Sequence, residues 1–303
     1  MSGRVWTARA SRGAMLGALA AVTLAASGCA YLDWKQREWI FRPVKDDWRG
    51  YQSQVSPKLE ELWLPVKSER ADAMAGADDK LHAWWWPADH AGAPTVLYLH
   101  GTRWNLTGNA FRIARLQRMG FNVLAVDYRG FGRSSGDLPS EQWTYEDAAT
   151  AWAYLKTREP EVTKRFIYGH SLGGAVAIDL ATKTNDAAGL ILEATFTSIR
   201  EMVGQTWAKF LPVGAIITQE YNSTGKIADV RMPILFVHGM ADRYVPYEMS
   251  ERLHALAKAP KRLYLVEGAG HSNTMWSAFD AYYKTVDEFR TFAVREGSAR
   301  IAR

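Results

Sequence analysis

The sequence has one cysteine, Cys29, among its 303 residues. A lone cysteine cannot form a disulfide within the chain, so in any compartment the fold must be stabilised by its hydrophobic core. Internal repeats and low-complexity segments are also absent. With 48% hydrophobic and 23% charged residues, the composition excludes a disordered chain, a collagen-like fibre and a multi-span membrane protein, and it predicts a globular protein with a sizeable core.

A large excess of one charge is missing as well. The formal net charge is +5, and three of these charges come from Arg4, Arg9 and Arg12, which precede the first acidic residue. The rest of the chain is close to neutral and has no basic stripe interleaved with aromatic residues, so we expect no nucleic-acid partner. No histidines and carboxylates stand at metal-ligand spacing such as His-Glu-x-x-His, so we expect no metal site.

The N-terminus has the pattern of an export signal. Positive residues up to Arg12 precede an apolar stretch over residues 13–26. This stretch is shorter than the about 20 residues that a helix needs to span a bilayer. We therefore expect residues 1–28 to be a signal peptide.

The residues that end this signal are Ala26-Ser27-Gly28-Cys29. They resemble the lipobox of bacterial lipoproteins, although Ala26 stands where leucine is usual. The resemblance implies that Cys29 is lipidated and anchors the protein to a membrane of the cell envelope. Ala30 is not the aspartate of inner-membrane retention, so in a cell with two membranes we expect the periplasmic side of the outer membrane. Ordinary signal cleavage and an uncleaved anchor are the alternatives.

Strand and helix patterns alternate along the rest of the chain. Short apolar runs predict strands at 62–67, 81–86, 95–99, 122–127, 165–168, 189–192, 234–237 and 262–266. Helical patterns occur at 110–119, 145–157, 172–182, 247–257 and 275–292. Apolar runs without polar alternation are typical of strands covered on both faces, and intervening helices predict a mostly parallel sheet. The fold class is therefore α/β, with eight strands flanked by helices.

The domain boundaries follow from this pattern. We expect one catalytic domain over residues 60–295 and a short tail over 296–303. Residues 29–59 are polar and aromatic, and they suggest a linker or a short helix on the domain edge. Trp84-Trp85-Trp86 lies on a predicted strand, where alternate side chains face opposite ways, so these rings are expected to pack in the core and edge and not to form one ligand platform.

A Gly-x-Ser-x-Gly motif lies between a predicted strand and a predicted helix. It reads Gly169-His170-Ser171-Leu172-Gly173. In such a nucleophile elbow the turn is too tight for side chains at the flanks, and the serine is held with its hydroxyl exposed above the sheet. Ser171 is the predicted nucleophile. The Leu172 N–H, at the start of the helix, is a predicted oxyanion donor, and the Thr102 N–H, after an earlier strand, is the second.

A serine hydroxyl needs a base, and the base needs an acid that orients it. Asp242 follows the predicted strand 234–237, and His271 follows the strand 262–266. Because the carboxyl ends of parallel strands meet at one edge of the sheet, we expect both to lie beside Ser171. Ser171, His271 and Asp242 are the predicted nucleophile, base and acid, and this mechanism needs no cofactor.

Other polar residues compete for these roles. Glu193 ends another predicted strand and is an alternative acid. His170, His100 and His238 are expected to be structural, with His170 pointing away from the nucleophile. The charged residues of the loop from Asp127 to Ser134 have no base beside them, so we expect them to brace loops.

Together these motifs resemble the α/β-hydrolase superfamily, in particular the branch with lysophospholipases, monoacylglycerol lipases and protein depalmitoylases. They are Leu99-His100-Gly101, Asp127-Tyr128-Arg129-Gly130-Phe131-Gly132, Gly169-His170-Ser171-Leu172-Gly173-Gly174, His238-Gly239-Met240-Ala241-Asp242 and Gly268-Ala269-Gly270-His271. The resemblance implies hydrolysis of carboxylic esters or thioesters, often with an acyl chain. Thr102-Arg103-Trp104-Asn105 departs from depalmitoylases, which have small residues there. A peptidase or amidase on the same fold and a non-catalytic binding lipoprotein are the alternatives.

Residues 195–232, between two predicted strands, are the expected lid. Its apolar residues are Trp207, Phe210, Leu211, Val213, Ile216 and Ile217. A lid of this length can cap the crevice and form the substrate pocket, or it can dip toward the membrane. We favour the first interpretation.

Overall fold

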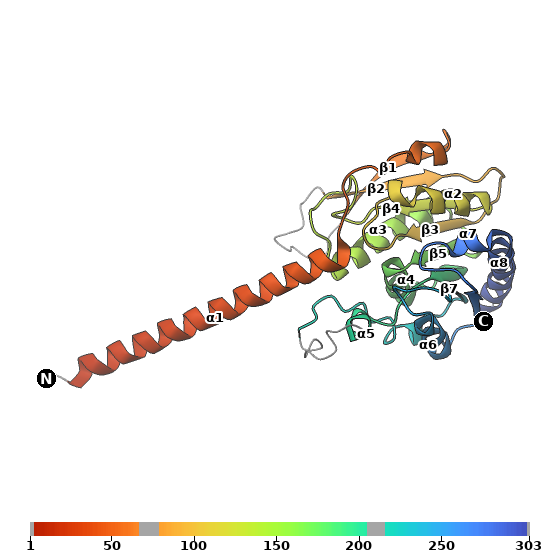
Figure 1. Cartoon of the computed structure of the whole chain (residues 1–303). Helices are drawn as coiled ribbons and strands as arrows, with labels where there is room; N and C mark the ends of the chain where they lie inside the picture. Colours follow the sequence, from red (N-terminus) through yellow and green to blue (C-terminus); the bar gives the residue numbers. More distant parts are fainter. Residues whose placement is uncertain (1–2, 67–78, 205–215, 302–303) are drawn as a thin grey trace.

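The computed structural model of the chain describes residues 3–66, 79–204 and 216–301. Its centre is an eight-stranded sheet (Figure 1). The strands are β1 (Glu60–Pro65), β2 (Lys80–Trp86), β3 (Thr95–Leu99), β4 (Asn122–Val126), β5 (Arg165–His170), β6 (Gly189–Glu193), β7 (Ile234–Gly239) and β8 (Lys261–Val266). All eight predicted strands are present, with each end within two residues of its predicted position.

The strand order is β1-β2-β4-β3-β5-β6-β7-β8. β2 pairs antiparallel with β1 and with β4, and the pairs from β4 to β8 are parallel. The carboxyl ends of the parallel strands therefore meet at one edge. The loops after β3, β5, β7 and β8 carry the predicted site residues to this edge, where open α/β sheets bind ligands.

Helices cover both faces of the sheet. They are α2 (Ala110–Arg118), α3 (Glu141–Arg158), α4 (Leu172–Lys183), α5 (Ile199–Gly204), α6 (Glu248–Leu256), α7 (Thr274–Ser277) and α8 (Phe279–Ile301), after a long N-terminal helix, α1 (Gly3–Phe41). Each face of the sheet has its own buried apolar cluster. One contains the inner sides of α3, α4 and α6, and the other contains those of α2 and α8. The predicted α/β-hydrolase architecture is confirmed.

Some helix boundaries differ from those that the sequence pattern predicts. α3 begins at Glu141 because the hydroxyl of Ser140 accepts a hydrogen bond from the backbone N–H of Trp143, 3.1 Å away. The predicted helix 275–292 is split in two, and Ala278 separates α7 from α8. The expected tail at 296–303 is helical up to Ile301, since α8 continues through it.

The three tryptophans of β2 are all buried. Trp84 and Trp86 join the cluster with α2 and α8, whereas Trp85 joins the opposite cluster. Alternate rings thus pack on opposite faces, as the strand period requires. The packing interpretation of this run is confirmed.

The N-terminal helix extends into the first part of the expected linker and ends at Phe41, before an irregular segment that leads to β1. The sequence suggests a linker or short edge helix after Cys29, but α1 runs without a break to Phe41, which is fully buried in the core. Arg37 donates through Nε to the carbonyl of Pro139 at 2.7 Å, and Gln36 donates to the carbonyl of Ile216 at 2.7 Å. These contacts between distant segments fix the last turns of α1, and spacing alone does not indicate them.

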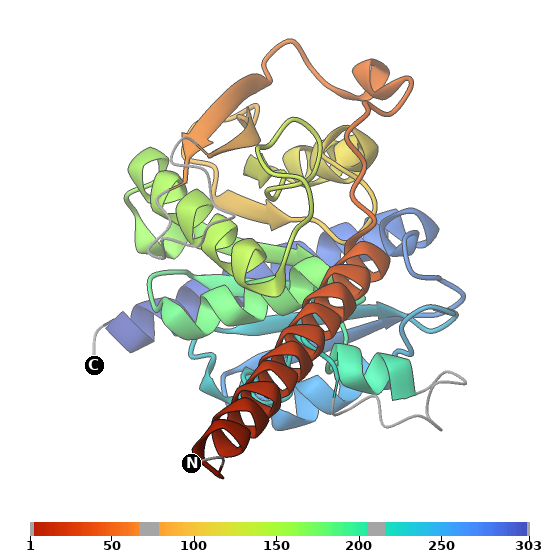
Figure 2. The ribbon, with the colours of Figure 1, turned by 90° about the vertical axis from the view of Figure 1, so that its left-hand side faces the viewer.

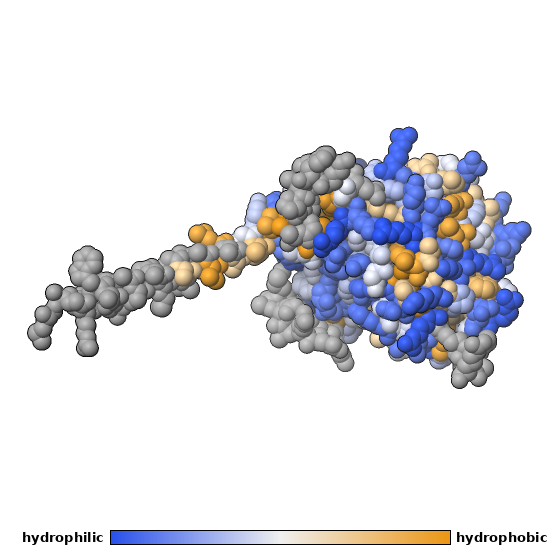
Figure 3. Space-filling view, turned by 90° about the horizontal axis from the view of Figure 1, so that it is seen from below, coloured by the Kyte–Doolittle hydropathy of each residue, from blue (hydrophilic) through white to orange (hydrophobic). Residues whose placement is uncertain are grey.

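The first turns of α1 project away from the body, and the end of the helix enters it between the part with β1, β2 and α2 and the part with α5 (Figures 1 and 2). Exposed apolar side chains line the described outer turns, among them Val22 and Leu24 (Figure 3). Within the described ranges, no helix is both long and apolar enough to cross a membrane.

The expected lid has three parts. Residues 195–204, including α5, border the cavity described below. Four of its predicted apolar residues, Trp207, Phe210, Leu211 and Val213, lie outside the described residues. Ile216 is exposed, and Tyr221, Ile227, Val230 and Met232 are buried in the core. The segment from Tyr221 onward is therefore part of the domain body and not a mobile cap.

Candidate active site

Ser171 lies on a sharp turn between β5 and α4. Its φ of 55° is in a region that L-residues rarely adopt. The glycines around it are required by space, because a Cβ on Gly173 would lie 2.1 Å from the carbonyl oxygen of Leu99. The turn is held by the Ser171 N–H, which donates to the carbonyl of Glu193 at 2.9 Å. This is the strained geometry expected of a nucleophile elbow.

The structure brings the predicted base and acid to this serine. The Oγ of Ser171 is 3.0 Å from Nε2 of His271, and Nδ1 of His271 is 2.7 Å from Oδ2 of Asp242. Both distances are hydrogen bonds, and they form one chain from hydroxyl to carboxylate. Such a chain can move the serine proton to the imidazole while the carboxylate orients the ring.

Asp242 has a second histidine partner. Nε2 of His238 lies 3.1 Å from Oδ2 of Asp242 and 2.9 Å from the carbonyl of Val245. Because a carbonyl only accepts, this Nε2 carries hydrogen and donates, and the hydroxyl of Ser250 donates to Nδ1 from 2.7 Å. Burial acts to raise the pKa of Asp242, but hydrogen bonds from His238 and His271 outweigh it and hold the pKa well below its usual value.

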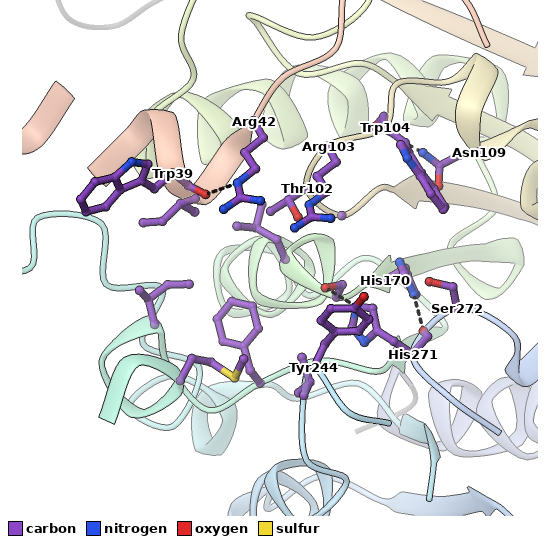
Figure 4. A pocket seen from close by; sticks show the side chains of 18 of the residues that line it. Trp39, Arg42, Thr102, Arg103, Trp104, Asn109, His170, Tyr244, His271 and Ser272 are labelled. Carbon is purple, nitrogen blue, oxygen red and sulfur yellow. Dashed lines mark hydrogen bonds between the residues drawn. The ribbon is translucent and has the colours of Figure 1, made fainter. Parts of the chain in front are cut away.

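A cavity of about 640 Å³ opens over these residues (Figure 4). Ser171, His271 and Tyr244 border it together with residues 101–104 of the loop after β3. An apolar wall comes from Phe196, Ile199, Met202 and Val203. Its size and apolar lining are typical of a pocket for a small organic substrate.

The two predicted oxyanion donors also border this cavity. Leu172 is the first residue of α4, and Thr102 lies in the loop after β3, which ends at Leu99. An N-terminal helix amide carries partial positive charge, so Leu172 is placed to stabilise an oxyanion next to Ser171. The space between the loop after β3 and the turn at Ser171 is narrow, since a Cβ on Gly101 would lie 3.1 Å from the Cβ of Ser171.

Comparison with known proteins shows to which family the chain belongs. A family model described as "Serine aminopeptidase, S33" (Hydrolase_4) matches residues 92–220. The uncharacterized protein Rv2307c of Mycobacterium tuberculosis is 36% identical over 258 residues, which are 84% of this chain and 87% of that protein. The α/β hydrolase domain-containing protein WAV2 of Arabidopsis thaliana is 30% identical over 249 residues, which are 76% of this chain and 78% of WAV2.

The chain belongs to the α/β-hydrolase family. The solved structure of the Pyrococcus furiosus esterase Pf2001 superposes on this hydrolase with a TM-score of 0.64 and 20% identity, over 83% of this chain and 98% of the esterase. At that identity the likeness shows the shared fold. The family model covers the elbow at Ser171, whereas Asp242 and His271 lie beyond its match.

In the hydrolase, Glu193 does not take the place of Asp242. It is fully buried, and its Oε1 accepts from Nη1 of Arg112 at 2.5 Å. Its Oε2 accepts from the hydroxyls of Tyr168 and, at 2.9 Å, of Tyr282, and Thr274 donates to its Oε1. With these partners Glu193 holds the segment after His271, and it has no contact with the imidazole among the described hydrogen bonds.

Asp127 and His100, both predicted to have structural roles, brace loops of the domain. Oδ1 of Asp127 accepts from the backbone N–H of Leu106 at 2.8 Å and lies 3.4 Å from Nε2 of His100. Burial acts to raise the pKa of Asp127, but the imidazoles of His100 and His82 hold it below its usual value. Asp127 therefore ties the loop after β4 to the loop after β3 and is not directed at the cavity.

His170 is closer to the site than the sequence suggests. An elbow turns neighbouring side chains apart, yet the ring of His170 borders the cavity, and its Nε2 donates to the carbonyl of His271 at 3.1 Å. Burial lowers the pKa of His170 well below its usual value, so the ring is neutral. Its role is to hold the backbone of the predicted base.

Sequence reasoning missed two contributions to the site. The bond from His238 to Asp242 joins residues four apart, one on β7 and one in the loop after it, and this spacing was the available signal. Trp39, Ile40 and Arg42 border the cavity from the end of α1, and no local pattern indicated that. Within the described ranges, no group of three or more histidine, cysteine, aspartate or glutamate residues is arranged to hold a metal.

Proposed function

We propose that the protein hydrolyses carboxylic esters or thioesters through a covalent acyl-enzyme. The observation that carries this proposal is the hydrogen-bonded chain from Ser171 Oγ through His271 to Asp242, with distances of 3.0 and 2.7 Å, beside an apolar pocket. An ester with an apolar acyl chain fits the wall of Phe196 and Met202. A pocket of this size accommodates a medium acyl chain together with its alcohol.

In this mechanism His271 takes the proton of Ser171 as its Oγ attacks the carbonyl carbon. The tetrahedral oxyanion is stabilised by the N–H groups of Leu172 and Thr102. His271 then gives the proton to the leaving alcohol or thiol, and the acyl-enzyme forms. A water molecule, deprotonated by the same imidazole, attacks the acyl carbon and releases the acid and the free serine.

A peptidase is the second candidate, and the family model's description names an aminopeptidase. An aminopeptidase must bind a free α-ammonium group, and a carboxylate is the usual partner for one. No aspartate or glutamate is among the described residues that line the cavity, whereas Arg42, Arg103 and Arg112 are. This charge distribution favours ester substrates over peptides with a free N-terminus.

The experiment compares 4-nitrophenyl hexanoate with alanine 4-nitroanilide, using the parent protein and Ser171→Ala. We expect hydrolysis of the ester by the parent only, with the anilide cleaved at least about 100-fold more slowly. Circular dichroism confirms that Ser171→Ala is folded. Faster cleavage of the anilide would favour the peptidase, and equal ester hydrolysis by Ser171→Ala would contradict the mechanism. A folded parent that is inert toward both would favour the binding lipoprotein.

We also propose that the mature protein begins at a lipidated Cys29 and is attached to the outer membrane of a cell with two membranes. Cys29 is exposed. It lies 12 residues before Phe41 on α1, which is about 18 Å at 1.5 Å per helical residue. Attachment at Cys29 would hold the cavity near the membrane surface, because the end of α1 forms part of its wall.

This proposal is tested by metabolic labelling with an alkyne-bearing fatty acid, followed by membrane fractionation and mass spectrometry of the N-terminus. We expect the parent to carry label at Cys29 and to sediment with outer membranes, and Cys29→Ser to lose the label. An unlabelled N-terminus at another residue would indicate ordinary signal cleavage. An intact Met1 would indicate an uncleaved anchor.

A further inference from the structure

Two arginines from different parts of the chain border the same side of the cavity. Arg42 follows the end of α1, and Arg103 lies in the loop after β3. Figure 4 shows both side chains next to Thr102, across the cavity from Tyr244 and His271. Both arginines remain accessible to solvent.

The backbone holds these two arginines in unusual conformations. The φ of Arg42 is 45° and that of Arg103 is 76°, in the left-handed region that disfavours residues other than glycine. The N–H of Arg103 donates to the carbonyl of Phe41 at 2.9 Å, which ties the two segments together. Backbone strain of this kind is often retained where it positions functional side chains.

Neither Arg42 nor Arg103 has an acidic partner among the described ion pairs. A third arginine that lines the cavity does have one. Arg112 is paired with Glu193 at 2.5 Å. For Arg42 the described contact is a hydrogen bond from Nε to the carbonyl of Trp39 at 3.1 Å. Two guanidinium groups on one wall repel each other, and a bound anion would remove this repulsion.

The opposite wall has a different chemistry. Phe196, Ile199 and Met202 line it, and none of them carries a charge. The cavity over Ser171 is therefore apolar on one side and cationic on the other. A substrate that matches both sides has an apolar chain and an acidic group, with the ester carbonyl between them.

We propose that Arg42 and Arg103 form an anion-binding subsite, and that the substrate is an acyl ester whose alcohol carries a phosphate or a carboxylate. The proposal rests on the ester hydrolysis proposed above. The apolar acyl chain lies against Phe196 and Met202, and the guanidinium groups bind the acidic group of the alcohol. Arginine suits this role because its planar fork of N–H donors matches both phosphate and carboxylate oxygens.

The test uses ester pairs that differ in the acidic group of the alcohol. Hexanoylglycerol phosphate is compared with hexanoylglycerol, and the hexanoyl ester of 4-hydroxybutanoate is compared with butyl hexanoate. The variants are Arg42→Gln, Arg103→Gln and the double substitution. Arg231→Gln is the control, because this exposed arginine precedes β7 at the opposite edge of the sheet. The measured quantity is the ratio of kcat/KM for the anionic ester to that for its neutral counterpart.

We expect the parent and Arg231→Gln to favour the anionic ester at least about 10-fold. Each Gln substitution should lower the ratio about 5-fold to 10-fold, and Arg42→Lys should restore part of it, since these are losses and gains of charge-assisted hydrogen bonds. Preference in both pairs indicates a general acidic group, and preference in the first pair alone indicates a phosphate. A parent ratio near one, or a ratio that the double substitution leaves unchanged, overturns the proposal.

A binding measurement separates this subsite from the proposed hydrolysis. Ser171→Ala protein is titrated calorimetrically with hexanoylglycerol phosphate, with and without Arg42→Gln and Arg103→Gln. Binding that the arginine substitutions weaken about 10-fold or more supports the subsite even if no ester is turned over. Equal binding with and without the arginines contradicts the subsite even if the parent is an active esterase.

Discussion

Nε2 of His238 and Nδ1 of His271 meet at one oxygen of Asp242, at distances of 3.1 and 2.7 Å. His238 is itself fixed, because Ser250 and the carbonyl of Val245 satisfy its remaining hydrogen-bonding capacity. The carboxylate is thus held from both sides. His238 acts through Asp242 and has the role of a positioning residue.

Replacement of His238 by alanine is expected to lower kcat/KM about 10-fold to 100-fold, since a hydrogen bond to a charged group contributes about 1.5–3 kcal/mol. Without this donor the pKa of Asp242 rises, so the loss of kcat/KM that follows protonation of this carboxylate should begin at a higher pH than in the parent. The control is His90→Ala, which removes an exposed histidine. A purely structural role would lower the fraction of folded enzyme and leave the shape of the pH profile unchanged.

Two groups of the site should keep their protonation state over a wide pH range. Hydrogen bonds from two histidines hold the pKa of Asp242 below its usual value despite burial. A lowered pKa keeps the carboxylate charged at lower pH, and His170 stays neutral because burial lowers its pKa. Between pH about 5 and 7, neither group should therefore change its protonation state. A slope of two in a plot of log kcat/KM against pH in this range would indicate that one of them does, and would contradict the assignment.

Glu193→Gln should destabilise the fold by about 3–5 kcal/mol, because it leaves the buried guanidinium of Arg112 without its carboxylate. Arg112 also donates to the carbonyl of Ser272 at 3.3 Å, beside the base. Urea unfolding monitored by tryptophan fluorescence measures the loss. Glu288→Gln on the exposed side of α8 is the matched control, and an equal effect of the two substitutions would contradict the role given to Glu193.

Phe41→Ala should lower the free energy of unfolding by about 3–5 kcal/mol, because the ring is fully buried and its removal leaves a cavity. The KM for acyl esters should rise as well, since Ile40 and Arg42 on either side border the cavity. The comparison is Leu32→Ala, a large-to-small change on the same helix at a side chain that is 44% exposed. If Phe41→Ala is as stable as Leu32→Ala, the end of α1 is not part of the domain core.

Local sequence patterns were sufficient for the sheet and the elbow. The apolar runs around Tyr98, Phe166 and Phe236 are short and bounded by turn residues, so each strand can be assigned from its own residues and their neighbours in the sequence. The glycines beside Ser171 are dictated by contacts under 3 Å that any side chain would make. The order of the strands along the chain then brings Asp242 and His271 to the same edge as Ser171.

Contacts between distant segments could not be read from such patterns. The pairing of Gln36 with residues 216 and 218 joins two segments about 180 residues apart. Glu193 ends β6 and Asp242 follows β7, so both lie at the same edge of the sheet. Only their partners distinguish them: Glu193 is bonded to Arg112, Tyr168, Thr274 and Tyr282, whereas Asp242 is bonded to His271. Contacts between residues far apart in the sequence set such roles, and local secondary-structure propensity does not indicate them.

The reactivity of Ser171 is the most direct measure of the proposed chemistry. Purified protein is treated with a fluorophosphonate probe, beside Ser171→Ala and His271→Ala, and the modified residue is located by mass spectrometry. We predict that the parent is labelled at Ser171 alone, that Ser171→Ala is not labelled, and that His271→Ala is labelled at least about 100-fold more slowly, because the hydroxyl has lost its base. A folded parent that the probe leaves unmodified, or that it modifies at another residue, would contradict the assignment of Ser171 as the nucleophile.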